Sequence, residues 1–508
     1  MQYEPIIGLE IHVQLKTKSK MFCGCDNTGE NQPPNTTICP ICLGHPGTLP
    51  VINKQAVDWS VMAALAINCQ IPQISKFDRK NYFYPDLPKG YQISQFDLPI
   101  GLEGFLEIEI DGQLKKIGLR RLHLEEDAAK LIHGKNESLV DFNRSGTPLM
   151  EIVTKPDIRS PREAKIFLRE LRKITRYLEV SEADMEKGHL RCDANISLRP
   201  LEVDDEFYPK TEIKNINSFR AVERALEYEF QRQTRLWDEK NPPRQQSTRG
   251  WNDDKQITEE QRLKEESADY RYFPEPDLPP LRFEADSIQL ISTSLPELPA
   301  AKKKRFIEMY GFTADDAQIL TDEKELAHFT EQVISELKEW LSTLEKSEKL
   351  DQEKVWPRRQ RRGWQKNKKE LVKLTAGWLI SKLFKLLNEN NLSIKQSKVT
   401  PENFAELISI IYQGKINSTV AQQVLEEMFA KGSDPSQIIE EKGLEQVSDE
   451  SQLEKIVNHV IANNPDELAK YKAGKTALFQ FFVGQVMKET KGKANPEVVA
   501  KLLKKKLI

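Results

Sequence analysis

The feature that most constrains this chain is an alternation of apolar and polar residues that begins close to its first residue. From Ile7 to Leu15 the odd positions are apolar, whereas the even positions are Gly, Glu, His and Gln. Successive side chains of a β-strand point to opposite faces, so this stretch predicts a strand that buries one face only. Glu10 and His12 then point together, away from the core.

The same alternation returns in two later segments. In residues 121–125 the polar face carries His123 and Glu125, and in residues 191–198 it carries Asp193. A strand that is merely solvated would carry Lys, Thr and Gln on that face. Three strands that offer carboxylates, imidazoles and guanidinium groups instead predict a sheet whose open face is an active site.

Length and composition restrict the class of protein. A chain of 508 residues is long enough for about three domains, and 38% hydrophobic with 30% charged residues can form buried cores. No apolar run approaches the roughly 20 residues of a membrane span. Six cysteines are too few for a disulfide scaffold, so we expect a cytoplasmic protein. Because the net charge is only -3, a nucleic-acid surface must come from local clusters.

The predicted elements change along the chain. Residues 1–295 contain short strands, Gly and Pro turns and two clear helices, near 161–178 and 219–236. We therefore expect an α+β domain with a mixed or antiparallel sheet and helices. Beyond it the strand signals stop, which predicts an all-α domain over 296–395. A small helical tail domain is expected over 396–508, because Thr400-Pro401 begins a new helix.

Four of the six cysteines are clustered in two close pairs. Cys23 and Cys25 flank one glycine, and Cys39 and Cys42 enclose Pro-Ile. Two such pairs in tight turns can supply four thiolates to a tetrahedral Zn²⁺. The sequence therefore predicts a structural zinc site. The alternative is four thiols that happen to lie close together in the sequence.

The carboxylates of the polar strand faces suit a second metal. Hard oxygen ligands are those that Mg²⁺ prefers. Glu151 has apolar neighbours on both sides, and a buried carboxylate must be paired or bind a ligand. We expect Glu10, His12, Glu125 and Glu151 to bind Mg²⁺, and these four with Asp193 to be the catalytic groups. The alternative for each one is a surface or ion-paired side chain.

A stretch over residues 78–92 combines cations with aromatic rings and prolines. It is either a rigid loop packed by its own rings or a wall that places Arg79, Lys80 and Lys89 near an anionic substrate. Lys and Arg groups on phosphoryl oxygens are the usual electrostatic partners of a metal site.

A second basic stretch lies between Trp356 and Lys369. Its cations are interleaved with two Trp residues, a pattern that suits a phosphate backbone with stacked bases, although a solvated loop has the same composition. The candidate contacts to RNA are Arg358, Arg359, Arg361 and Arg362.

Taken together, these motifs resemble one family, the B subunits of the tRNA-dependent amidotransferases that convert Glu-tRNA(Gln) or Asp-tRNA(Asn) to the amide. The similarity covers nearly the whole chain. The matching runs are residues 8–12, 39–47, 79–92, 123–128, 141–151, 191–195, 212–219, 269–274, 482–488 and 492–496.

The resemblance implies a cradle-shaped α+β domain with a kinase site, a helical domain and a tail that helps to hold tRNA. It implies that ATP phosphorylates the side-chain carboxylate of the misacylated residue and that ammonia then displaces phosphate. It also implies two partner chains, a glutaminase A subunit and a small C subunit. Residues implied to bind substrate or ATP are Arg79, Lys80, Tyr82, Lys89, Asn143, Arg144, Glu212 and Lys214, and Lys491 and Lys493 are implied to contact tRNA.

Two other functions compete with this one. A non-catalytic tRNA-binding scaffold with a zinc knuckle would need Lys and Arg on its open face, whereas Glu10, Glu125, Glu151 and Asp193 would repel RNA. A free-standing amidase is disfavoured because the sequence has no Gly/Ser-rich Ser-Ser-Lys nucleophile region. The sequence does not distinguish Glu-tRNA(Gln) from Asp-tRNA(Asn).

Overall fold

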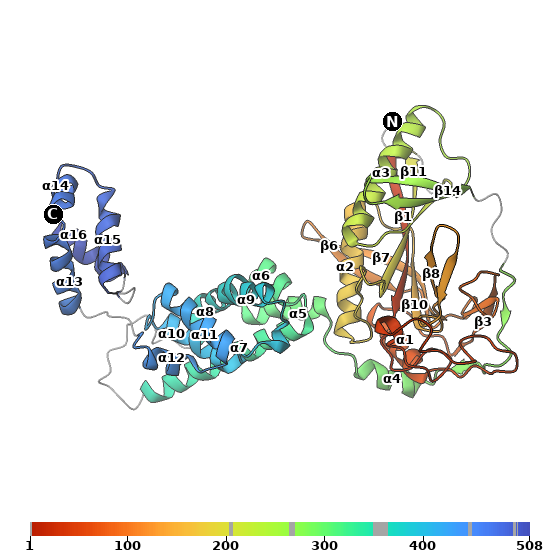
Figure 1. Cartoon of the computed structure of the whole chain (residues 1–508), viewed down its shortest axis with the longest axis horizontal. Helices are drawn as coiled ribbons and strands as arrows, with labels where there is room; N and C mark the ends of the chain where they lie inside the picture. The colour runs from red at the N-terminus through yellow and green to blue at the C-terminus, as the bar shows by residue number, and fades with distance from the viewer. Residues whose placement is uncertain are drawn as a thin grey trace. The chain divides into compact units, whose positions relative to one another are not determined.

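The computed structural model describes residues 3–202, 207–263, 270–348, 364–444, 450–490, 494 and 496–507. The chain forms two compact units, Met1–Leu298 and Pro299–Ile508. The first contains a mixed sheet with helices and the second is helical, which confirms the predicted fold class (Figure 1). No helix in the described ranges has both the length and the hydropathy that a bilayer crossing requires.

Within the described residues, the main sheet of the first unit has nine strands. Its order is β14-β13-β12-β11-β1-β10-β7-β5, and β6 pairs with β7. Neighbours are antiparallel except β12 and β13, which are parallel. The strands are β1 Tyr3–Gln14, β5 Gly101–Leu102, β6 Phe105–Ile110, β7 Gln113–Glu126, β10 Pro148–Thr154, β11 Leu190–Pro200, β12 Thr211–Lys214, β13 Ser247–Asn252 and β14 Ile257–Leu263.

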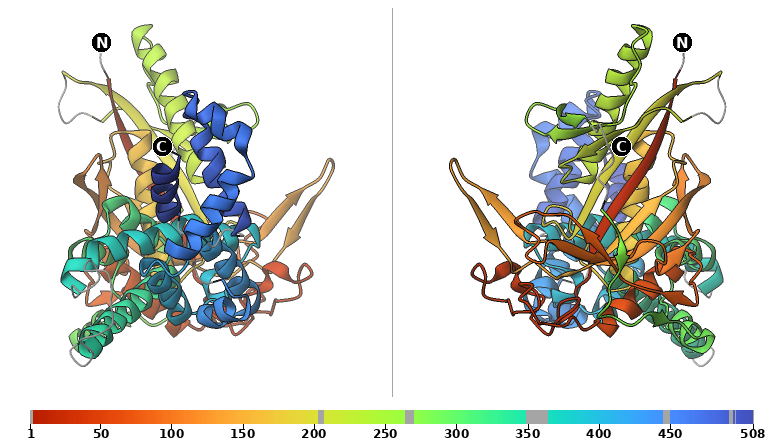
Figure 2. Two further views of the ribbon diagram at one scale, coloured as in Figure 1. Left: turned by 90° about the vertical axis from the view of Figure 1, so that its left-hand side faces the viewer. Right: turned by 90° about the vertical axis from the view of Figure 1, so that its right-hand side faces the viewer.

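The central strand β1 shows why the sheet has two different faces. Ile7, Leu9 and Ile11 are fully or almost fully buried in the core of the first unit. That face is covered by α2 (Pro161–Tyr177) and α3 (Phe219–Asp238), which lie along the sheet (Figures 1 and 2). Both helices confirm the sequence prediction. The opposite face is therefore left to the polar residues of the alternation.

Short strands and further helices complete the first unit. The small sheets are β15-β3-β4, β16-β2 and β8-β9. Their strands are β2 Ile74–Ser75, β3 Asp78–Asn81, β4 Tyr91–Ser94, β8 Lys130–His133, β9 Ser138–Asp141, β15 Phe273–Pro274 and β16 Leu281–Arg282. The remaining helices are α1 Lys54–Ala66, η1 Gly29–Asn31 and α4 Ala285–Thr293.

The second unit consists of helices, and local capping residues set the ends of several of them. The Asn417 side chain accepts a hydrogen bond from the Val420 amide at the start of α11, and Gly432 ends that helix with a φ of 78°. The helices are α5 Pro299–Arg305, η2 Phe306–Tyr310, α6 Ala314–Leu320, α7 Lys324–Glu348, α8 Trp364–Trp378, η3 Leu379–Leu383, α9 Phe384–Glu389, η4 Ile394–Gln396, α10 Pro401–Tyr412, α11 Ser418–Lys431, α12 Pro435–Glu441, α13 Glu450–Ala462, α14 Pro465–Lys472, α15 Leu478–Glu489 and α16 Pro496–Lys506.

The packing of this unit differs from the division expected near residue 395. One apolar core runs from Phe306 to Ile439 and a separate one from Leu453 to Leu507. The rings of Phe329 and Phe404, on either side of the expected boundary, have centroids 6.0 Å apart. The Thr400-Pro401 signal therefore marks the start of a helix inside a core, because N-terminal caps specify helix ends and not domain ends.

This packing predicts different outcomes for two truncations. A chain ending at residue 444 should keep the cooperative unfolding of the core that contains Phe404. A chain ending at residue 395 should lose it, since α7 would then expose its apolar face. Limited proteolysis within α7 and thermal unfolding by circular dichroism would distinguish them. Equal protease resistance of α7 in both chains would contradict this division.

Candidate active site

The polar face of the main sheet brings together side chains from three adjacent strands. The pairing of β1 with β10 places His12 opposite Glu151, and the pairing of β10 with β7 places Glu151 opposite His123. Side chains directly opposite in an antiparallel pair have Cβ atoms about 5 Å apart. Glu151 therefore lies between two imidazoles, and Glu10 and Glu125 flank them two residues along β1 and β7.

The distances show a compact cluster. His123 Nε2 lies 3.0 Å from Glu151 Oε2, and His12 Nε2 lies 3.6 Å from both Glu125 Oε1 and Glu151 Oε2. Two overlapping groups have ligand atoms within 4.8 Å of one another: Glu10, His12 and Glu151, and His123, Glu125 and Glu151. Both groups have the donor chemistry of a metal site.

Charge balance sets the protonation of the cluster. Burial alone would raise the pKa of Glu151, but His123 and His12 outweigh it and hold that pKa well below its usual range. Burial alone would lower the pKa of His123, but Glu151 and Glu125 raise it to about 9. Burial and then the nearby Glu151 carboxylate raise the pKa of Glu10. Without a metal, imidazolium groups thus compensate the buried carboxylates.

Asp193 lies beside this cluster and not within it. The register places it opposite Glu10, but its Oδ2 is 2.5 Å from Lys214 Nζ. Lys214 also lies 3.1 Å from Glu212 Oε1, and Glu212 accepts a hydrogen bond from the Thr248 hydroxyl. Four of the five expected residues therefore converge, and His123 joins them as the fifth member of the cluster, whereas Asp193 pairs with Lys214 beside it.

The small sheet β15-β3-β4 supplies a lysine to the same site. Burial alone would lower the pKa of Lys80. The nearby Glu125 carboxylate has the largest effect in the other direction, and the pKa of Lys80 is raised above its usual range. Lys80 forms no ion pair with any residue that the structure describes. Its neighbour Arg79 points the other way, as strand alternation requires, and both guanidinium hydrogen bonds to Glu275 are 2.7–2.8 Å long.

Several other predicted substrate residues hold the protein together. The side-chain oxygen Oδ1 of Asn143 accepts hydrogen bonds from the Thr36 and Thr37 amides. The Arg144 guanidinium donates to the backbone carbonyls of Ala128 and Ala129. Lys89 is ion-paired with the buried Glu126, and Tyr82 packs edge-on against Tyr270. The polar groups of Asn143, Arg144 and Lys89 thus have protein partners, and a role of all four predicted residues in binding substrate stays a prediction.

A cavity of about 620 Å³ adjoins the cluster on the polar face of the sheet. Glu10 lines the end nearest the cluster, and Gly8, Asn195 and Thr154 line its floor. A Cβ atom on Gly8 would meet no atom closer than 3.9 Å, so the glycine leaves open space for a ligand. Asn195 Oδ1 is buried and has no hydrogen-bond partner within the described protein.

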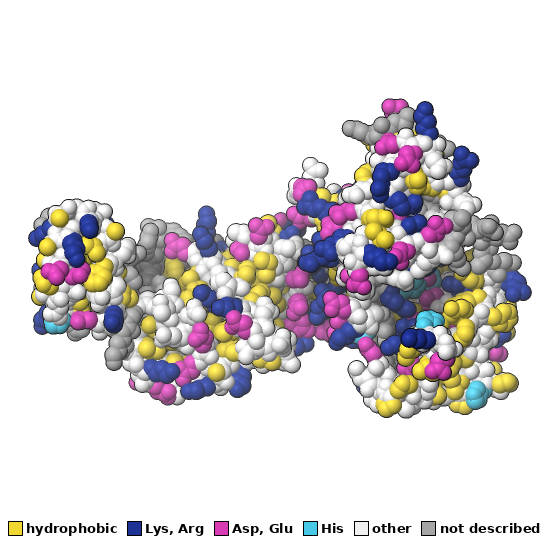
Figure 3. All heavy atoms as spheres, turned by 45° about the horizontal axis from the view of Figure 1, so that its top comes forward, with side chains coloured by type: hydrophobic (Ala, Val, Ile, Leu, Met, Phe, Trp, Pro, Cys, Tyr) yellow, Lys and Arg dark blue, Asp and Glu magenta, His cyan; other side chains and the backbone are white. Residues whose placement is uncertain are grey.

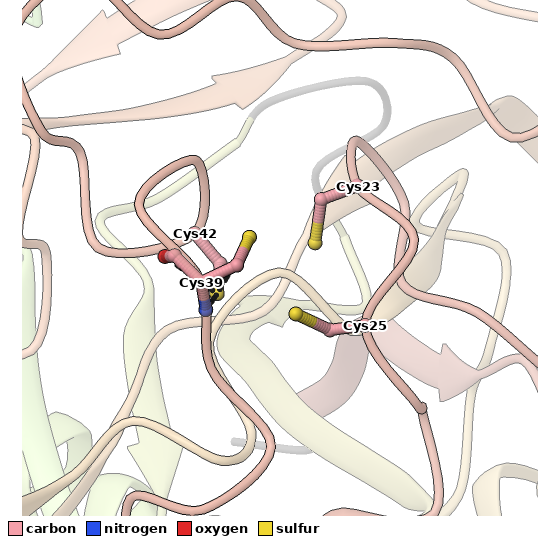
Figure 4. Close-up of side chains that lie close together, drawn as sticks. All are labelled: Cys23, Cys25, Cys39 and Cys42. Atoms are coloured by element: carbon pink, nitrogen blue, oxygen red, sulfur yellow. Dashed lines mark hydrogen bonds between the residues drawn. The ribbon is translucent and has the colours of Figure 1, made fainter.

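The four clustered cysteines converge as the sequence predicts. Figure 4 shows Cys23 and Cys25 on one loop facing Cys39 and Cys42 on another, and their sulfur atoms lie within 4.8 Å of one another. The Cys39 and Cys42 sulfurs are 3.9 Å apart. A hydrogen bond from Cys23 lowers the pKa of the Cys42 thiol to about 5, so a thiolate is readily formed there. The group can hold a metal ion.

Comparison with known proteins decides the family. A family model described as the GatB/GatE catalytic domain matches residues 5–289, and one described as the GatB domain matches residues 365–507. The chain belongs to the GatB/GatE family. This confirms the resemblance inferred from the motifs.

The similarity extends over the full length of relatives in this family. Three of them carry the name of the B subunit of aspartyl/glutamyl-tRNA(Asn/Gln) amidotransferase. The protein of Carboxydothermus hydrogenoformans is 47% identical over 511 residues, covering 100% of this chain and 99% of the relative. The protein of Thermotoga maritima is 48% identical over 513 residues, covering 100% of this chain and 99% of the relative. That of Persephonella marina is 48% identical over 507 residues, covering 100% of both chains.

His123 is the member of the cluster that the sequence reasoning left out of its catalytic set. It is only 2% exposed and closest to the central Glu151. The signal was present, since His123 shares a strand face with Glu125. What the sequence did not show is that β7 lies next to β10.

None of the residues predicted to contact RNA belongs to the part of the chain that the structure describes. Arg358, Arg359, Arg361, Arg362, Lys491 and Lys493 lie outside the described residues. On the face that Figure 3 shows, basic and acidic side chains are interspersed. A role in RNA binding therefore stays a prediction for these six residues.

Proposed function

We propose that this chain is the subunit of an amidotransferase that phosphorylates the side-chain carboxylate of Glu-tRNA(Gln), Asp-tRNA(Asn) or both and then forms the amide. The observation that carries this proposal is the group of three glutamates and two histidines, partly or fully buried, beside an open cavity. Membership of the GatB/GatE family supports it. A scaffold that only bound RNA would have no use for buried carboxylates that repel phosphates.

Mg²⁺ fits the carboxylate cluster. Glu10, Glu125 and Glu151 offer the oxygen ligands that it prefers, and His12 or His123 would complete the set or orient a bound water. When bound, the ion would neutralise charge that moves between phosphoryl oxygens during transfer.

The protein groups around the cluster suit ATP and an acyl acceptor. The cavity over Gly8 would take the nucleoside, with the Asn195 carbonyl accepting from its amino group, so that the phosphates extend toward Glu10. The Lys80 ammonium would hold the γ-phosphoryl group and the incoming carboxylate together. A carboxylate becomes a useful acyl electrophile only when one oxygen is turned into a leaving group, and phosphorylation accomplishes this.

The ammonia would come from a partner, because the chain lacks the nucleophile region of a glutaminase. We infer a glutamine-hydrolysing A subunit and a small C subunit in the same complex, with misacylated tRNA as substrate. The second unit and the basic stretch near 358–369 would contact the tRNA. Such a complex would act in the cytoplasm, where tRNA is aminoacylated.

A structural Zn²⁺ fits the four cysteines. The 3.9 Å between the Cys39 and Cys42 sulfurs is close to the ~3.8 Å that tetrahedral bonds of about 2.3 Å imply. Bound there, the ion would cross-link two loops of the first unit.

Glu125→Gln should abolish ATP-dependent phosphorylation of the tRNA-bound carboxylate. The rate should fall by at least about 100-fold, because the loss of a metal ligand costs several kcal/mol of transition-state stabilisation. Assays would follow phosphate release in the complex with its partners. Glu107→Gln, on the exposed part of β6 and ion-paired with Lys116, is the matched control. Near-normal ATP cleavage by folded Glu125→Gln would favour the RNA-binding scaffold.

Gly8→Val should impair ATP binding more than it impairs the chemical step. The added side chain projects from β1 into the cavity, and a β-branched residue suits a strand. We expect the KM for ATP to rise about tenfold, which corresponds to ~1.4 kcal/mol, with the KM for tRNA almost unchanged. Gly8→Ala should show a smaller effect. An unchanged KM for ATP in both variants would place the nucleotide elsewhere.

Purified protein should contain about one Zn²⁺ per chain, the capacity of one four-thiolate site. Elemental analysis would measure it after purification without chelators. Cys42→Ser should lose the ion, whereas Cys69→Ser should keep it, since Cys69 lies in the apolar core of the first unit. Zinc retained by Cys42→Ser, or absent from the unaltered protein, would contradict this site.

A further inference from the structure

Arg271 has an unusual backbone conformation next to the candidate active site. Its φ is 42°, in the left-handed region that residues with a Cβ atom rarely adopt. The residue lies between Tyr270 and Tyr272, and both of these side chains contact other aromatic rings. A conformation of this kind persists only where the surroundings hold it in place.

The Asn81 amide supplies that restraint. Its Nδ2 donates to the Arg271 carbonyl at 2.8 Å and lies 3.3 Å from the Tyr270 carbonyl. The Asn81 backbone amide also donates to the Tyr270 carbonyl, at 2.9 Å. Two consecutive carbonyls of the left-handed turn are therefore bound by one residue of β3. Beyond the turn, β15 pairs with β3 through only Phe273 and Pro274, and proline has no N–H to donate.

The turn determines where two tyrosine rings lie. Tyr272 stacks on Phe96 with ring centroids 4.2 Å apart, and the Tyr270 ring lies 5.9 Å from that of Tyr82. Lys80, the neighbour of Asn81 on β3, has its Nζ 5.0 Å from the Tyr270 ring centroid. An ammonium over an aromatic face is held by a cation–π interaction. The Tyr270 ring thus helps to set the direction of Lys80, and the stacking of Tyr272 on Phe96 holds the other side of the turn.

We propose that Asn81 is a positioning residue for phosphoryl transfer, which acts by holding Arg271 in the left-handed conformation and so directing Lys80 toward Glu125 and Glu151. The inference rests on the proposed function, since Lys80 acts on the phosphoryl group only if the reaction takes place here. Asn81 itself touches no reacting atom.

The test compares variants of the intact complex in phosphorylation of the tRNA-bound carboxylate. Asn81→Asp keeps the volume of the side chain but removes the side-chain N–H groups that donate to the turn. We expect its kcat to fall at least tenfold and its KM for ATP to change less than threefold, because the cavity over Gly8 is built from other strands. Hydrogen exchange in residues 270–275, measured by mass spectrometry, should accelerate. Asn81→Ala should behave in the same way.

Arg271→Gly tests the cause, since glycine adopts the left-handed conformation without steric cost. The double variant Asn81→Asp/Arg271→Gly should therefore have a kcat within threefold of the kcat of Arg271→Gly alone. Asn68→Ala is the control, because that amide also donates to a distant carbonyl, of Phe105, but away from Lys80. It should leave kcat unchanged.

Unchanged kcat and exchange in Asn81→Asp would overturn the inference, as would a failure of Arg271→Gly to restore activity. If the unaltered complex showed no ATP-dependent phosphorylation, the proposed function would fail instead. The hydrogen-exchange comparison would then still decide whether Asn81 holds the turn.

Discussion

Strand β1 is paired on both sides, and the functional part of the molecule depends on that pairing. Antiparallel registers with β10 and β11 place His12 opposite Glu151 and Glu10 opposite Asp193. Residues from separate parts of the sequence thereby come within about 5 Å of one another. A shift of one residue would turn these side chains into the apolar core, so the buried face that packs on α2 and α3 also fixes the register of the site.

The electrostatics of the cluster follow from this geometry. Glu125 and Glu151 are almost fully buried, and close carboxylates repel each other strongly in a medium of low dielectric. His12 and His123 compensate them in the protein alone. Under the proposed function, the same set would become a ligand shell when a divalent cation takes over that role. A buried acidic group of this kind stabilises the fold poorly by itself, and this is one reason why we propose a chemical role for it.

Support for the cluster comes from segments outside the main sheet. The β15-β3-β4 sheet turns Lys80 toward the glutamates and Arg79 toward Glu275. The hydrogen bonds of Asn143 and Arg144 fasten neighbouring loops. Neighbouring residues of one motif thus have different places: some side chains face the cluster, and others hold together the loops around it. Strand alternation and local hydrogen bonding, rather than residue type, make that division.

By itself, the sequence determined the strand and helix periodicities, the bounds of α2 and α3, the cysteine pairs and the polar strand faces that carry Glu10, His12 and Glu125. These are local properties that depend on alternation, capping and spacing. Tertiary structure alone decided that His123 joins the cluster, that Lys214 takes Asp193 out of it, and that α10 packs in the same core as α7. Each of these outcomes depends on which segments become neighbours across long stretches of chain, and strand order and helix packing are not encoded in any local pattern.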